Sequence, residues 1–228
     1  APGSATTFTW TYSTAGAGVL TFLGGASGQD ANSGRTATMA GVPSPAVTVL
    51  APAGLSIVGV VLSPSPAVQG EVVTATMTLR NSGETGARVT VTAITEAESD
   101  AAVFGAPSAS WPALPVLVPA NGTLAISWTY TTGACGTATV TAGVAGEDAV
   151  TGKPIPFLQV TSDQLVVLGP PAKLVLSVTP SAAAAEAVVT LVAIVRDACG
   201  RGLAGKALTF ALVGGGGRLA FLGAPSDV

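Results

Sequence analysis

The sequence predicts an all-β protein of antiparallel sandwiches, because it shows alternating strands, regularly spaced turns and an internal repeat. Apolar residues alternate with threonine or other small residues in three runs, at 73–79, 124–130 and 137–142. One apolar face and one threonine face is typical of antiparallel strands with a single solvated side. Threonine is β-branched and favours an extended backbone. We therefore expect these three runs to be strands.

Turn-forming residues separate the expected strands at the spacing of a sandwich. These turn signals are Asn-Ser-Gly at 81–83, Asn-Gly at 121–122, and the glycine-bounded segments 133–136 and 146–152. The one stretch of helical composition, 182–187, is short and follows Pro180. We expect a turn between strands there.

The composition argues against several classes of function. Only 9% of the 228 residues are charged, the net charge is −3, and the basic residues are scattered, whereas an average soluble domain has about 25% charged residues. Nucleic acid and anionic membranes are therefore not expected as partners. The absence of histidine excludes a histidine-dependent triad and a histidine pH switch. No apolar run approaches the roughly 18–20 residues of a membrane-spanning helix.

An internal repeat of about 118 residues is the strongest signal. Trp10-Thr11-Tyr12 recurs as Trp128-Thr129-Tyr130, and 11 of the 26 aligned positions from Trp10 to Arg35 are identical. Gly105–Ser108 recurs as Gly223–Ser226 at the same offset of 118 residues. At an offset of 116 residues, Val72-Val73-Thr74 and Arg80-Asn81 match Val188-Val189-Thr190 and Arg196-Asp197. A two-residue insertion in an intervening loop accounts for the difference.

The repeat divides the chain into one whole unit and two halves. Residues 53–169 form the complete unit, 1–50 the second half of a unit, and 171–228 the first half of one. The two halves together lack only the equivalents of the eight residues 111–118. Two arrangements are therefore expected. Either the chain is a segment of a longer array of units, or its two halves complete one another, within one chain or between successive subunits of a fibre. A half sandwich exposes an apolar face and unpaired edges, so it needs a partner.

The complete unit resembles a bacterial cell-adhesion-related domain of the Ig-like sandwich class. The shared pattern is a first strand ending in Ser63-Pro64, the strand Val72–Arg80, the turn Asn81-Ser82-Gly83, and a late Leu-x-Ile-x-Trp-x-Tyr strand. Residues 171–228 resemble the start of a bacterial Ig-like domain of the invasin and intimin type. Val195–Gly205 and Leu208-Thr209-Phe210 carry that likeness, with Gly202 where proline is usual.

The resemblance implies tandem Ig-like antiparallel β-sandwiches in an extracellular or bacterial cell-surface protein. Such modules serve as spacers, fibres or adhesive shafts and bring no catalytic residue, metal or cofactor. The expected partners are other copies of the chain or adjacent Ig-like domains, and a cell-surface glycan or protein is a further candidate.

The two cysteines lie in similar turns of successive units. In the strand order of an Ig-like sandwich, Cys135 follows the fifth strand, and Cys199 follows the second strand of the next unit. Cys135 therefore lies at the end of its unit from which the chain leaves, and Cys199 at the end of the next unit where the chain enters. These two ends face each other in a head-to-tail array. A Cys135–Cys199 disulfide, two separate thiols and a bond to another chain all remain open. A disulfide requires an oxidising compartment.

The remaining candidate residues are read first as structural. Asp30 and Asp148, in matching turns, are expected to form those turns rather than bind calcium. Glu96, Glu98 and Asp100 are expected in a solvated loop. The glycine run 214–217 lacks the lysine of a phosphate-binding loop, so it predicts a flexible turn.

The aromatic residues divide into expected core residues and one expected contact residue. The alternation places Trp10, Tyr12, Trp128 and Tyr130 in cores rather than on a sugar-binding platform. Trp111 lies in a proline-rich segment outside any alternation, so it is the candidate contact residue, with packing beneath a loop as the alternative.

These observations favour a non-catalytic structural module that forms a stalk, filament or adhesin shaft. Short proline-containing linkers at 50–53 and 169–172 would keep successive units in line. The alternative function is a carbohydrate- or protein-binding accessory module of a secreted enzyme. An enzyme is disfavoured, because no nucleophile motif accompanies the missing histidine.

Overall fold

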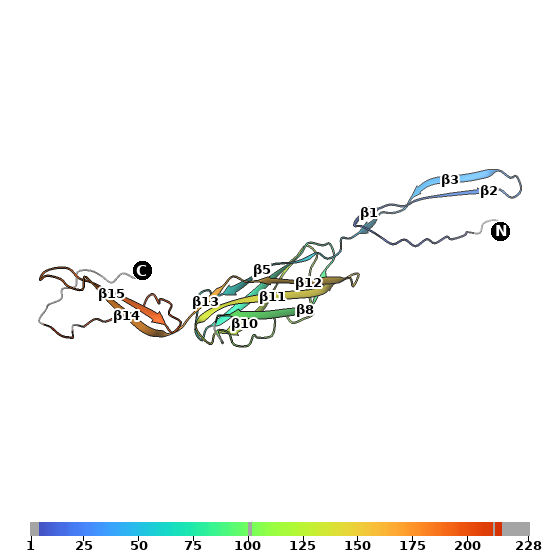
Figure 1. The fold of residues 1–228 in the computed structure, drawn as a ribbon. Coiled ribbons are helices and arrows are strands. Elements are labelled where there is room, and N and C mark those ends of the chain that lie inside the picture. The colour runs from blue at the N-terminus through green and yellow to red at the C-terminus, as the bar shows by residue number, and fades with distance from the viewer. Residues whose placement is uncertain (1–4, 100–101, 212, 216–228) are drawn as a thin grey trace.

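The protein is all-β, as the sequence predicts. The computed structural model describes residues 5–99, 102–211 and 213–215, and within them it contains strands and turns but no helix. No helix long and apolar enough to cross a membrane therefore occurs in the described part of the chain. Figure 1 shows an elongated molecule with a central sandwich and a thin arm at each end.

The first sheet of the central sandwich has three antiparallel strands in the order β10-β7-β5. Their bounds are Leu55–Ser63 for β5, Val72–Asn81 for β7 and Thr123–Thr131 for β10. The runs 73–79 and 124–130 lie within β7 and β10, so both strand predictions are confirmed.

The second sheet packs against the first and has six strands. Its path is β6-β13-β11-β8-β9, and β12 pairs with the distal part of β11. All pairs are antiparallel except β6 with β13. The strand bounds are Ala67–Val68 for β6, Ala87–Glu98 for β8, Val116–Val118 for β9, Gly136–Asp148 for β11, Pro154–Thr161 for β12 and Leu165–Leu168 for β13. The predicted strand 137–142 lies within β11.

The core lies between these sheets and follows the alternation in the sequence. On β7, the four apolar residues of the alternating series are fully buried, while the threonines between them are half-buried. Trp128 and Tyr130 of β10 are also buried, as predicted. The Tyr130 ring stacks on Phe104 with 4.6 Å between centroids. The β7 residues in the core are Val73, Ala75, Met77 and Leu79.

The N-terminal arm consists of two short antiparallel strand pairs. β1 pairs with β4, and β2 pairs with β3. Residues 5–17 precede these strands and form no strand themselves. The bounds are Gly18–Leu20 for β1, Leu23–Gln29 for β2, Thr36–Pro43 for β3 and Val47–Val49 for β4.

The C-terminal arm is one hairpin followed by irregular chain. β14 (Pro171–Thr179) pairs with β15 (Thr190–Asp197), and the segment between them contains the turn predicted at 182–187. Residues 203–211 form no strand. The match at 223–226, part of the glycine run at 214–217, and Asp100 lie outside the described residues.

Candidate functional site

Strand pairing in the N-terminal arm recurs in the central sandwich 118 residues later. Gly18 pairs with Val49, and Gly136 pairs with Val167. The hairpin partners Gly28 and Ala37 likewise correspond to Gly146 and Ile155. The β2–β3 and β11–β12 hairpins thus share their register apart from the position of one bulge.

The turns of these two hairpins also share their hydrogen bonds. Oδ1 of Asp30 accepts the N–H of Ser33 at 2.7 Å, and Oδ1 of Asp148 accepts the N–H of Thr151 at 2.8 Å. Each aspartate also accepts the hydroxyl of that same serine or threonine. The prediction that both aspartates form turns is confirmed.

The C-terminal hairpin repeats the register of β5 and β7 at an offset of 116 residues. Leu62 pairs with Ala75 in the sandwich, and Val178 pairs with Leu191 in the arm. Both pairings also contain one bulge near the end at which the first strand begins. Each arm therefore has the strand pairing of one part of the sandwich, and no described strand covers it as the second sheet does there.

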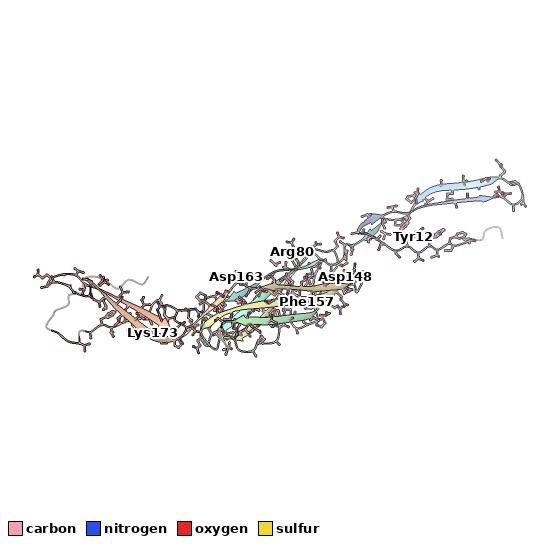
Figure 2. The ribbon with its side chains drawn as sticks, viewed as in Figure 1. Tyr12, Arg80, Asp148, Phe157, Asp163 and Lys173 are labelled. Atoms are coloured by element: carbon pink, nitrogen blue, oxygen red, sulfur yellow. A yellow bond between two sulfur atoms is a disulfide. The ribbon has the colours of Figure 1, made fainter. Side chains whose placement is uncertain are left out.

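Trp10 and Tyr12 were expected in a core, and that prediction is wrong for this chain. Their side chains are 72% and 68% exposed, whereas Trp128 and Tyr130 at the equivalent positions are 4% and 1% exposed. The reason is the missing partner: β10 pairs with β7 and faces a second sheet, while residues 5–13 pair with no strand of the described chain. Figure 2 shows Tyr12 on the arm, outside the sandwich.

The N-terminal joint is held by backbone hydrogen bonds to buried and exposed carboxylates. The N–H of Ala51 donates to Oε2 of Glu84 at 2.8 Å, and the N–H of Ala53 donates to Oδ2 of Asp148 at 2.8 Å. Gly83 allows the linker to pass, because a Cβ there would lie 2.1 Å from the carbonyl oxygen of Pro52. The linker is therefore fixed against the end of the sandwich.

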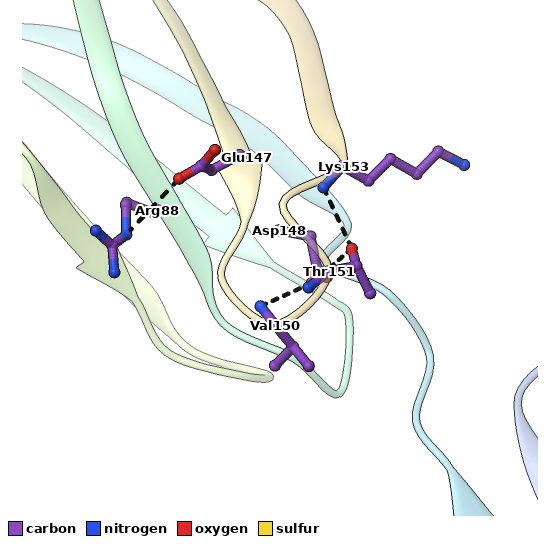
Figure 3. A network of polar contacts seen from close by, with 6 residues as sticks. All are labelled: Arg88, Glu147, Asp148, Val150, Thr151 and Lys153. Carbon is purple, nitrogen blue, oxygen red and sulfur yellow. Dashed lines mark hydrogen bonds and ion pairs between the residues drawn. The ribbon is translucent and has the colours of Figure 1, made fainter.

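Asp148 links the turn and the joint. Its Oδ1 accepts the N–H groups of Val150 and Thr151 in the turn (Figure 3). Its Oδ2 accepts the Thr85 hydroxyl and the N–H of Ala53 in the linker. The Thr85 hydroxyl, followed by the N–H groups of Ala53 and Thr151, holds the pKa of Asp148 well below its usual range, although burial opposes this. The neighbouring ion pair, Arg88 with Glu147 at 3.9 Å, is half-exposed, and such pairs contribute about 0–1 kcal/mol.

The C-terminal joint is held by a disulfide and by Asp197. Cys135 in the sandwich is bonded to Cys199 in the arm, with Cα atoms 6.0 Å apart. The carboxylate of Asp197 accepts the N–H of Gly169 at 3.0 Å and the N–H of Arg201 at 2.8 Å. Burial acts to raise the pKa of Asp197, but these hydrogen bonds and the charge of Arg201 outweigh it, so the pKa is lowered.

The acidic cluster belongs to a strand rather than the expected loop. Glu96 and Glu98 lie at the end of β8, so the prediction of a loop is wrong for both. Glu96 accepts the hydroxyl of Tyr130 at 2.8 Å, and Glu98 accepts the N–H of Phe104 at 2.8 Å. Burial and the bond to Glu96 raise the pKa of Tyr130 well above its usual value. Among the described residues, no group of three or more carboxylates and cysteines is placed to hold a metal ion.

Trp111 is 75% exposed, on a segment whose backbone is fixed. Its N–H donates to the carbonyl of Ser127 at 2.9 Å, and its carbonyl accepts the N–H of Ser127 at 2.8 Å. The alternative of packing beneath a loop is therefore wrong.

The sequence did not point to the side chains that fix the N-terminal joint. Glu84 and Thr85 follow an ordinary turn, and Asp148 reads as a turn former alone. Their contacts with the linker join residues 33, 34 and 95 positions apart, which local patterns do not reveal.

No protein-family model matches this chain, and no curated protein matches it.

Proposed function

We propose that this chain is a non-catalytic structural module of a bacterial surface or secreted protein, in which Ig-like units in series form a stalk, filament or adhesin shaft. The observation that carries the proposal is the parallel pairing of β6 with β13. Ala67 pairs with Val167, Val68 pairs with Leu168, and the N–H of Gln69 donates to the carbonyl of Leu168 at 2.8 Å.

This pairing lies in the path of a pulling force. β5 and β6 open the sandwich, so tension between the two arms pulls β6 toward the N-terminal arm. The opposite force enters through the Cys135–Cys199 disulfide at the start of β11 and reaches β13 through its pairing with β11. The hydrogen bonds of parallel strands loaded in this way share the force, whereas a hairpin pulled from its open end breaks one bond at a time. The sandwich therefore suits a load-bearing role.

The two joints support the same role. The carboxylates of Glu84 and Asp148 fix the N-terminal linker, and the Cys135–Cys199 disulfide fixes the C-terminal one. A disulfide requires an oxidising compartment, which agrees with export from the cytoplasm.

Single-molecule force spectroscopy of the full chain, tethered at its two ends, tests this proposal. Gln69→Pro removes the N–H that bonds Leu168 and should lower the unfolding force of the sandwich. Val160→Pro, on β12 outside the load path, removes an N–H that faces β11 and is the matched control. Stability in urea is measured for both variants. If the unfolding force of both variants falls in the same proportion to their loss of stability in urea, the load-bearing role is contradicted.

The exposed side chain of Trp111 supports a second candidate function, a carbohydrate- or protein-binding accessory module. Exposed tryptophan on a fixed backbone presents a large apolar surface at small entropic cost. Binding to insoluble polysaccharides that disappears in Trp111→Ala, while the fold is retained, would establish it. Equal retention of both proteins would exclude Trp111 as the contact.

A further inference from the structure

β15 has an open edge where β7 has a partner. β7 lies between β5 and β10, whereas β15 pairs with β14 alone among the described strands. A turn bonds the last residues of β15 through the N–H of Leu203 and the carbonyl of Val195. Residues 190–194 therefore present a free edge, and Leu191, the equivalent of fully buried Ala75, is 44% exposed.

Residues 5–13 have the sequence of the strand that is missing from this edge. They align with β10, carry the same Trp-Thr-Tyr series, and form no strand in the described chain. Phe8, Trp10 and Tyr12 are all at least 68% exposed, while their equivalents on β10 are at most 4% exposed. Among the described residues, an extended apolar segment and an open apolar edge thus both have no partner strand.

The central sandwich shows how the two pieces would pair. There Trp128 pairs with Ala75, and Ser127 pairs with Thr76. Shifting these pairs by the two repeat offsets, 118 and 116 residues, places Trp10 opposite Leu191 and Thr9 opposite Val192. The same shift places Phe8 opposite Ala193, where the sandwich has Ile126 opposite Met77.

Side-chain sizes in this register compensate for one another. Phe8 is larger than its equivalent Ile126, and Ala193 opposite it is smaller than its equivalent Met77. Leu191 in turn replaces the smaller Ala75. Packing in protein cores tolerates changes that conserve total volume, so the two arms carry side chains suited to each other.

The two arms of one chain lie too far apart to meet. Figure 1 shows them at opposite ends of the sandwich. β11 has 13 residues and runs along the sandwich, which at about 3.3 Å per residue separates the arms by roughly 40 Å. The two described arms therefore cannot complete each other within one molecule.

We propose that the N-terminal arm of one copy completes the C-terminal arm of a second copy, with residues 7–13 added as a strand to the free edge of β15. This is β-strand addition through a heterologous contact, which repeats without closing when each copy donates one arm and accepts one. The proposal rests on the proposed structural function and names its partner.

Cysteine pairs across the new contact test the register. Ser127 bonds Trp111 through both its N–H and its carbonyl, so it forms a non-hydrogen-bonded pair with Thr76, the kind with close Cα atoms. Thr9→Cys in one full-length chain and Val192→Cys in another should therefore form a disulfide-linked dimer on oxidation. The matched control is Ser177→Cys, exposed on β14 beside Val192. It lies two strands from residue 9, roughly 10 Å away and beyond disulfide reach.

The double variant Thr9→Cys/Val192→Cys should form a ladder of covalent multimers. A dimer yield no greater than with Ser177→Cys would overturn the proposal. An internal bond within monomers would overturn it too, because the halves would then meet within one chain.

Two exposed tryptophans provide a control that does not use cysteine. Trp10→Asp should abolish concentration-dependent association in sedimentation velocity, because it places a charge in the new core. Trp111→Asp should associate like the parent chain, although Trp111 is as exposed as Trp10 in the single molecule. Equal behaviour of the two variants would contradict the proposal.

Failure of the contact and failure of the structural function give different results. The force measurement uses single chains. If the unfolding force falls in Gln69→Pro but no cross-linked dimer forms, the structural function is supported and the contact between copies is not. If cross-linked dimers form but Gln69→Pro does not lower the unfolding force, the contact is supported and the load-bearing role is contradicted.

Discussion

The central sandwich and the N-terminal arm contain the same Trp-Thr-Tyr sequence in opposite environments. Trp128 is 4% exposed and Trp10 is 72% exposed, yet the hairpins that follow them share strand register and turn hydrogen bonds. The comparison teaches that local sequence is sufficient for the hairpins and turns, whereas burial depends on strands from elsewhere in the unit. Each arm keeps the strand pairing of part of the sandwich, but the described residues include no strands that cover it.

Replacing each of the two tryptophans with alanine should produce the largest difference in the free energy of unfolding between the sandwich and the arm. Trp128→Ala removes a buried side chain and should lower the free energy of unfolding by about 3–5 kcal/mol. Trp10→Ala in monomeric protein should change it by less than about 0.5 kcal/mol, because an exposed side chain loses little packing. Urea unfolding followed by circular dichroism measures both. Similar losses for the two variants would mean that Trp10 is buried in the isolated chain.

Replacing the two equivalent turn aspartates should produce a smaller difference in the free energy of unfolding. In Asp148→Asn, an amide N–H₂ or a weaker acceptor must face the N–H of Ala53, and the expected loss is about 1–3 kcal/mol. Asp30→Asn keeps an oxygen for its turn and, with no linker contact among the described residues, should lower the free energy of unfolding much less than Asp148→Asn does. The same urea titrations compare them. Equal effects would show that the contact with the linker contributes nothing.

Mild acid should produce the smallest effect. The folded state lowers the pKa of Asp148 below the ordinary value of 3.8, so its contribution is complete above that value and is lost as the pH falls toward the folded pKa. From pH 6 to pH 3.5, Asp148 should lose about 0.6 kcal/mol. The chain has no histidine, so stability should be nearly constant between pH 5 and 8. Asp148→Asn should weaken the acid dependence, and an unchanged acid limb would contradict this assignment.

The sequence predicts the fold much better than it predicts the joints. Alternation located β7 and β10, because a half-buried strand requires a period of two. The matching Asp30 and Asp148 turns were predictable because each turn is made by residues at most five positions apart. These features depend on neighbours in the chain.

Features that depend on distant residues were not predictable in the same way. The second role of Asp148 depends on Ala53, which is 95 residues away. The alternation predicted that Trp10 lies in a core. An alternating pattern indicates which face of a strand is apolar, but it does not indicate whether a second sheet packs on that face. The Cys135–Cys199 bond was one of three alternatives, and it forms because the fold brings two residues 64 positions apart to a Cα–Cα distance of 6.0 Å.

Amide hydrogen exchange of residues 7–13, measured from low to high protein concentration, tests the central claim most directly. Their equivalents in β10, residues 125–131, provide an internal reference in the same spectra. If the arms of two copies complete each other, residues 7–13 should exchange as an unpaired segment at low concentration and approach the protection of β10 as the chains associate. Exchange of residues 7–13 at the unprotected rate in fully associated protein would contradict the account.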